Sequence, residues 1–156
     1  VSGILFNHES PRRGFEFVTR KISYTVAQIK LGLETKLSLG NISSKRDWGH
    51  AKDYVLAMWM MLQQKKPQDF VVSTGKQFSV EQFVEEAFKC VGLNYHKYIK
   101  INKNLIRPAE VDSLLGNCNK ARKLLRWKPK ITFKELVKDM VQSDLDFVKN
   151  KVTKFK

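Results

Sequence analysis

Two arginines in loops carry the clearest chemistry of this chain. The 29 basic residues comprise 22 lysines and 7 arginines, so arginine is the scarcer cation. Arg46 lies between an expected strand and an expected helix, and Arg107 precedes a proline. A guanidinium offers a planar fork of donors, which gives a diphosphate paired, charge-assisted hydrogen bonds. Residue type and position alone leave two interpretations open for these arginines, phosphate binding and a surface ion pair to Asp47 or Glu110.

A polar block at residues 7–14, which reads Asn-His-Glu-Ser-Pro-Arg-Arg-Gly, separates a short apolar strand from a helix. Parallel sheets meet their ligands at the carboxyl ends of strands, and Asn7 lies at such an end. The helix opens with Val18, Thr19 and Lys21, and the N-terminal amides of a helix attract anions. We therefore expect this block to be a phosphate-handling loop that leads into the helix.

Alternating strands and helices position these residues, which indicates the α/β class. Apolar residues at three-to-four spacing predict helices at residues 17–31 and 50–64. Capping boxes at Ser79/Gln82 and Thr132/Glu135 start two more helices. Glycines 32 and 92 are expected to end the first and the third of these four helices. The other expected elements are strands at residues 3–6, 36–39, 70–72 and 98–101, and a short helix at residues 119–125.

Two further predictions concern the burial of one helix and the order of the C-terminal tail. The helix at residues 50–64 is apolar nearly all round, which predicts that it is deeply buried. The basic tail at residues 149–156 is expected to fray, as chain ends without packing partners do.

Composition excludes several classes of protein. A chain of 156 residues that is 42% hydrophobic can form one or at most two small globular domains. It has no apolar run of about 18 residues and no signal-peptide pattern, so neither a membrane span nor secretion is expected, and the cytosol is the predicted compartment. Cys90 and Cys118 show no metal-ligand or disulfide spacing and are expected to be free thiols.

The formal net charge of +14 raises the question of nucleic-acid binding. Clustered lysines and arginines bind phosphates by releasing counterions. Here the lysines are spread over almost every segment, and the densest stretch is residues 119–130. Specific nucleic-acid binding is therefore not expected, although a non-catalytic basic module that binds polyanions stays as an alternative function.

Several blocks, in the same order along the chain, resemble the GDP-mannose 4,6-dehydratases, a family of extended short-chain dehydrogenase/reductases. The resemblance extends from Gly3 to about Asp144. It implies an NADP-dependent lyase that converts GDP-mannose to GDP-4-keto-6-deoxymannose, acts as a dimer or tetramer and uses no metal. A fragment of a related GDP-sugar reductase or epimerase is the alternative. The blocks are residues 7–14, Leu39-Gly40-Asn41, residues 45–54, residues 107–112 and Trp127-Lys128-Pro129.

The resemblance also implies a role for each candidate site residue. His8 and Arg13 would contact the NADP cofactor, whereas Asn7 would contact the phosphate and hexose of the substrate. The substrate diphosphate would be held by Arg46 and Arg107. The other implied substrate-binding residues are Val18, Thr19, Lys21, Leu39, Gly40, Asn41 and Glu110, and those expected to be structural are His50, Asp53, Asp112 and Trp127.

The family's catalytic half has no counterpart here. None of the eight glycines forms the glycine-rich turn that binds a dinucleotide, and none of the four tyrosines is followed four residues later by lysine. We therefore expect residues 1–156 to be the C-terminal substrate-binding portion, without the NADP-binding catalytic portion and without a catalytic residue. Its Ile4 and Val71 strands would be outer strands of a larger Rossmann-type sheet, next to a small α/β substrate-binding domain. One departure from the family is Arg126, where glycine is common before the Trp127-Lys128-Pro129 turn.

Overall fold

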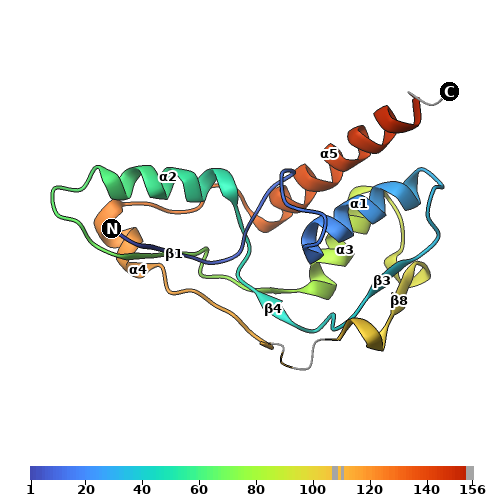
Figure 1. Ribbon diagram of the computed structural model, residues 1–156, viewed down its shortest axis with the longest axis horizontal. Helices are drawn as coiled ribbons and strands as arrows, with labels where there is room; N and C mark the ends of the chain where they lie inside the picture. The colour runs from blue at the N-terminus through green and yellow to red at the C-terminus, as the bar shows by residue number, and fades with distance from the viewer. Residues whose placement is uncertain (107–108, 110, 154–156) are drawn as a thin grey trace.

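The computed structural model describes residues 1–106, 109 and 111–153. Figure 1 shows two groups of elements, the first around α2, α4 and β1 and the second around α1, α3, β3 and β8. The helices are α1 (Val18–Lys30), α2 (Ala51–Leu62), α3 (Val80–Cys90), α4 (Asn119–Leu125) and α5 (Phe133–Thr153), with 3-10 turns η1 (Tyr95–Lys97) and η2 (Lys103–Leu105). The strands are β1 (Gly3–Leu5), β2 (His8–Glu9), β3 (Leu37–Leu39), β4 (Lys45–Arg46), β5 (Gly49–His50), β6 (Phe70–Val72), β7 (Phe78–Ser79) and β8 (Ile99–Ile101).

The first group is built on a parallel pair of strands. β1 pairs in parallel with β6 in a register that sets Ile4 beside Val71, which agrees with a place for both strands in a parallel sheet. Helices α2 and α4 pack on this pair, and a buried cluster that includes Tyr54, Phe70 and Trp127 holds the four elements together.

The second group is a three-helix layer beside a second parallel pair. Helices α1, α3 and α5 enclose an apolar core, and β3 pairs with β8 so that Leu37 lies beside Ile99. A buried ion pair crosses this layer, since Arg20 Nη2 on α1 lies 2.8 Å from Asp144 Oδ1 on α5. Ser23 also donates to the Asp144 carboxylate, at 2.6 Å.

Two very short strand pairs connect the groups. β2 and β5 are parallel, whereas β4 and β7 are antiparallel with Arg46 opposite Phe78. Asp47, directly after β4, is fully buried and accepts hydrogen bonds from Thr74, Gly75 and Gly116. This carboxylate ties the end of β4 to the loop after β6, so it fixes where the neighbouring Arg46 lies.

Most local predictions are confirmed. Both capping boxes form, at Ser79/Gln82 before α3 and at Thr132/Glu135 before α5. Gly32 and Gly92 take positive φ values of 71° and 69° just beyond α1 and α3. Arg126 ends α4 with φ 55°, a left-handed conformation that favours glycine, which explains why glycine suits this position.

The structure differs from the sequence patterns in two places, the burial of α2 and the end of α5. Helix α2 is buried on one face only: Val55, Trp59 and Leu62 are 61%, 59% and 72% exposed. The all-round apolar pattern therefore includes a face that no described part of this chain covers. Helix α5 continues to Thr153, so residues 149–153 of the tail that was expected to fray are helical; residues 154–156 lie outside the described part.

Candidate functional site

A cleft of about 700 Å³ opens at the N-terminus of α1, beside the short strands β2 and β4 that connect the two groups. Separate parts of the chain line it, among them the loop after β2, the start of α1, the end of β3 and strand β4. The predicted site residues that line this one cleft are Asn7, Arg13, Val18, Thr19, Lys21, Leu39, Gly40, Asn41 and Arg46. Residues up to 39 positions apart in sequence are thereby gathered around a single hollow.

The N-terminus of α1 faces this cleft. Phe17, at the N-cap, has no polar side chain to cap the helix, and the first turn contains no acidic residue. The first backbone amides of α1 are therefore not neutralised by a capping side chain, and the helix dipole adds partial positive charge there. This arrangement suits an anion in the cleft.

The far wall of the cleft comes from a segment that the sequence analysis did not single out. Asn104, Leu105 and Ile106 lie there because β8 pairs with β3 and carries the chain past Gly40. A Cβ atom on Gly40 would lie 2.5 Å from the carbonyl oxygen of Leu105, so glycine allows this close approach of two backbones. No local sequence pattern reports such a non-local pairing.

Arg46 reaches the cleft from β4. Its Nη1 donates to the carbonyl of Lys45 at 2.8 Å, and the side chain is half-buried. Ser44, two residues earlier, also lines the cleft; it is buried, and its Oγ has no hydrogen-bond partner among the described residues. The other predicted diphosphate ligand, Arg107, and the predicted substrate-binding Glu110 lie outside the described residues.

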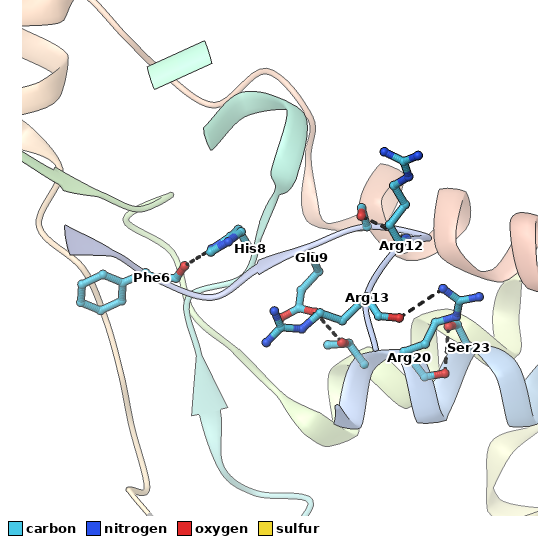
Figure 2. Close-up of polar contacts among 9 residues, drawn as sticks. Phe6, His8, Glu9, Arg12, Arg13, Arg20 and Ser23 are labelled. Atoms are coloured by element: carbon cyan, nitrogen blue, oxygen red, sulfur yellow. Dashed lines mark hydrogen bonds and ion pairs between the residues drawn. The ribbon is translucent and has the colours of Figure 1, made fainter. Parts of the chain in front are cut away.

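His8 lines a smaller hollow of about 310 Å³ next to the main cleft, and Asn7 and Arg13 line both. The Nδ1 atom of His8 lies 3.0 Å from the carbonyl oxygen of Phe6 (Figure 2), and its ring stacks on Tyr54 with centroids 5.2 Å apart. These contacts hold the imidazole at the carboxyl end of β1, beside the main cleft.

Glu9 is a cleft residue that the sequence analysis missed. It is only 2% exposed, and its Oε2 accepts a hydrogen bond from the Thr19 hydroxyl at 2.7 Å and lies 3.2 Å from Arg13 Nε. Arg13 in turn lies over the Phe17 ring, 3.5 Å from its centroid. Burial raises the pKa of Glu9, although Thr19 and Arg13 act in the opposite direction. The alternation of polar and apolar residues in a two-residue strand is too short to signal this buried carboxylate.

The residues expected to be structural mostly prove so. His50 is buried, with Nε2 3.0 Å from Asp139 and Nδ1 accepting from the Lys52 amide. Asp53 accepts from the amides that follow Pro129, and its own carbonyl accepts from the Trp127 indole. The Asp112 carbonyl accepts from the Lys45 amide, but pairing of its carboxylate with an arginine stays a prediction. Cys90 and Cys118 are free thiols, as expected.

A second cleft, of about 850 Å³, shares Trp48 with the first. Its described lining includes six cationic side chains and no carboxylate. We call it the basic cleft, and its cations are Lys76, Arg122, Arg126, Lys128, Lys130 and Lys134. All six are exposed to solvent, and four of them, Arg122, Arg126, Lys128 and Lys130, belong to the densest basic stretch of the sequence.

Among the described residues, no helix combines the length and the apolar character that crossing a membrane requires. Nor does this part of the chain bring together three His, Cys, Asp or Glu side chains that could hold a metal ion.

The mixed α/β fold of this chain matches part of the Rossmann-type fold of extended short-chain dehydrogenase/reductases. Its solved relatives include RMD from Pseudomonas aeruginosa, solved with NADPH (TM-score 0.85, 22% identity, 93% of this chain and 48% of that one). A dTDP-glucose 4,6-dehydratase from Bacillus anthracis, solved with NAD, is similar over 96% of this chain and 44% of its own (TM-score 0.78, 20% identity). At these identities the likeness shows the fold alone.

The chain belongs to the GDP-mannose 4,6-dehydratase family, whose model matches residues 1–140. It is 55% identical to GDP-mannose 4,6 dehydratase 1 of Arabidopsis thaliana over 95% of this chain and 41% of that protein. The corresponding enzyme of Dictyostelium discoideum is 54% identical over 96% of this chain and 47% of its own length. The chain thus spans less than half the length of these curated relatives.

Proposed function

We propose that the protein to which this chain belongs is an NADP-dependent GDP-mannose 4,6-dehydratase, and that residues 1–156 are its C-terminal substrate-binding portion. The gathering of nine predicted residues around one cleft is the observation that supports this assignment. The NADP-binding catalytic portion would then lie outside residues 1–156. A homo-oligomer and a cytoplasmic location are further predictions of the same assignment.

In this proposal the cleft holds GDP-mannose through three kinds of group. Arg46, together with Arg107, gives charge-assisted hydrogen bonds to the diphosphate, and the amides at the start of α1 add partial positive charge. The backbone of residues 39–41 contacts the guanine, beside the close approach at Gly40. Asn7 reaches the phosphate and hexose.

His8 and Arg13 would hold part of the NADP cofactor. An arginine suits the phosphates, and the hollow of about 310 Å³ beside His8 is large enough for one part of a dinucleotide but not for all of it. When bound, the cofactor would supply hydride transfer to and from the sugar. This chain would contribute one wall of the cofactor site and would position the substrate against it.

An activity assay separates this proposal from a related reductase or epimerase. The complete protein, incubated with GDP-mannose and NADP, should yield a 4-keto-6-deoxy sugar, whereas an epimerase would return an isomer of GDP-mannose. Residues 1–156 alone should give no product. Failure of the complete protein to form the 4-keto sugar would reject the assignment, and turnover by residues 1–156 alone would show that the catalytic residues have been misplaced.

A further inference from the structure

We infer that Glu9 is a positioning residue that couples the cofactor side of the cleft to its substrate side. The inference rests on the proposed function, because it takes Arg13 as a cofactor ligand and the start of α1 as part of the substrate site. Because Glu9 is only 2% exposed, it is assigned no direct contact with either ligand. It acts through the two side chains that its carboxylate holds.

The geometry makes one oxygen atom the junction between the two sides. Oε2 of Glu9 accepts the Thr19 hydroxyl at 2.7 Å and pairs with Arg13 Nε at 3.2 Å. Figure 2 shows Glu9 reaching from β2 toward Arg13, which lies in the loop before α1. Thr19 is in the first turn of α1 and is 1% exposed, so its position follows that of the helix start.

A second contact fixes the same loop from the other end. Arg20 Nη1 donates to the Arg13 carbonyl at 3.3 Å, as the dashed line in Figure 2 marks, and Arg20 is held by the buried Asp144. The backbone of Arg13 is therefore fixed by Arg20, and the side chain is oriented by Glu9 and the Phe17 ring. Among the contacts of the described residues, those of Glu9 link that side chain to Thr19.

Burial makes this junction strong and hard to replace. A carboxylate that is 2% exposed has lost its hydration, so it depends on the hydrogen bond and the ion pair that it makes. A neutral amide in its place could still accept from Thr19 but would no longer attract the guanidinium. Because Oε2 of Glu9 contacts both Arg13 and Thr19, a cofactor that orders Arg13 should also order the start of α1. Binding of the cofactor should therefore favour binding of the substrate, and the free-energy difference is the coupling between the two ligands.

The test measures NADPH affinity of the complete protein with and without saturating GDP. In the unchanged protein, GDP should tighten NADPH binding by about fivefold or more, the lower range of typical couplings. Glu9→Gln should weaken NADPH binding by roughly tenfold, as loss of a charged partner does, and should abolish the effect of GDP. Thr19→Val should remove the effect of GDP on NADPH affinity, and Thr19→Ser should restore that effect.

Glu16→Gln is the matched control, since it removes the same charge from an exposed position lining the same cleft. It should change neither NADPH affinity nor coupling. Coupling that persists in folded Glu9→Gln or Thr19→Val, or an equal effect of Glu16→Gln, would overturn the inference while leaving the proposed function intact. If Glu9→Gln does not fold, the comparison of Thr19→Val with Thr19→Ser tests the inference, through the effect of GDP on NADPH affinity. A complete protein that binds neither NADPH nor GDP would instead reject the proposed function, and this inference with it.

Discussion

Arg46 and Lys45 are adjacent cations on β4, and only Arg46 lines the cleft. Successive side chains of a strand point to opposite faces, so one residue of the pair faces the hollow and the other faces solvent. Lys45 is exposed, and its backbone is bonded to Asp112 and Leu114. This neighbour therefore separates a specific contact from a general loss of positive charge.

Replacement of Arg46 by alanine should weaken GDP-mannose binding by roughly 1.5–3 kcal/mol, the scale of a hydrogen bond to a charged group. Titration calorimetry on the complete protein measures the change. Lys45→Ala should have almost no effect, because screened charges at the surface contribute little. Arg107→Ala is predicted from the sequence to behave like Arg46→Ala. Wild-type affinity in the Arg46 and Arg107 variants would reject them as diphosphate ligands.

Arg126 is a single residue whose backbone conformation opposes its side chain. With φ 55° it lies in the left-handed region, which costs a residue with a Cβ roughly 1–2 kcal/mol. Arg126→Gly should therefore raise the free energy of unfolding by about 0.5–1 kcal/mol, after allowing for the greater freedom of unfolded glycine. Lys123→Gly, inside α4, should lower it by a similar amount. Urea unfolding curves in which both variants are destabilised would contradict this explanation.

At the scale of elements, α1 is held in place by α5. The Arg20–Asp144 ion pair is buried between them, and removal of one partner leaves the other charge unpaired away from water. Asp144→Ala should therefore destabilise the fold by about 3–5 kcal/mol, measured by urea unfolding. Asp146→Ala, in the same helix but exposed, should cost far less, since the Asp146 carboxylate accepts a surface hydrogen bond from Gln142. Equal losses in the two variants would refute the role of the ion pair.

How far the elements could be predicted depends on whether the determining contacts are local. Capping boxes such as Ser79/Gln82 and stops such as Gly92 lie within a few residues, so helix ends were predictable. The wall of the cleft at residues 104–106 depends on the pairing of β3 with β8, in which Leu37 and Ile99 are 62 residues apart in sequence. This wall could therefore not be predicted from local sequence patterns. The exposed face of α2 was mispredicted because an apolar side chain indicates burial but does not identify the segment that it packs against.

The same limit applies to the site. Family resemblance marked residues that line the cleft, such as Asn7 and Arg46, because their types and order form recognisable blocks. It did not mark Glu9, although Glu9 is inside one of those blocks, because the role of this residue follows from burial and two contacts. The type of a residue in the sequence indicates which ligand chemistry it could bind. It gives less information about the residues that position a ligand-binding side chain.

For the whole molecule, the high net charge and the basic cleft are consistent with the alternative function, the binding of polyanions. Six exposed cations should neutralise phosphates of any sequence, so duplex DNA should bind weakly and lose affinity steeply as salt rises toward physiological concentration. Lys128→Gln with Lys130→Gln should reduce the salt dependence, and GDP-mannose binding should not change. Sequence-selective binding of DNA that survives about 0.2 M salt would favour a nucleic-acid function instead.

Hydrogen exchange of the complete protein, with and without GDP-mannose, tests the central claim most directly, because it locates the bound ligand along the chain. The account predicts that amides in residues 6–14, in the first turn of α1 and in residues 37–46 become protected together when GDP-mannose binds. Amides in residues 122–134, which line the basic cleft, should exchange as before. Protection confined to residues 122–134, or no protection around the first cleft under saturating GDP-mannose, would contradict the account.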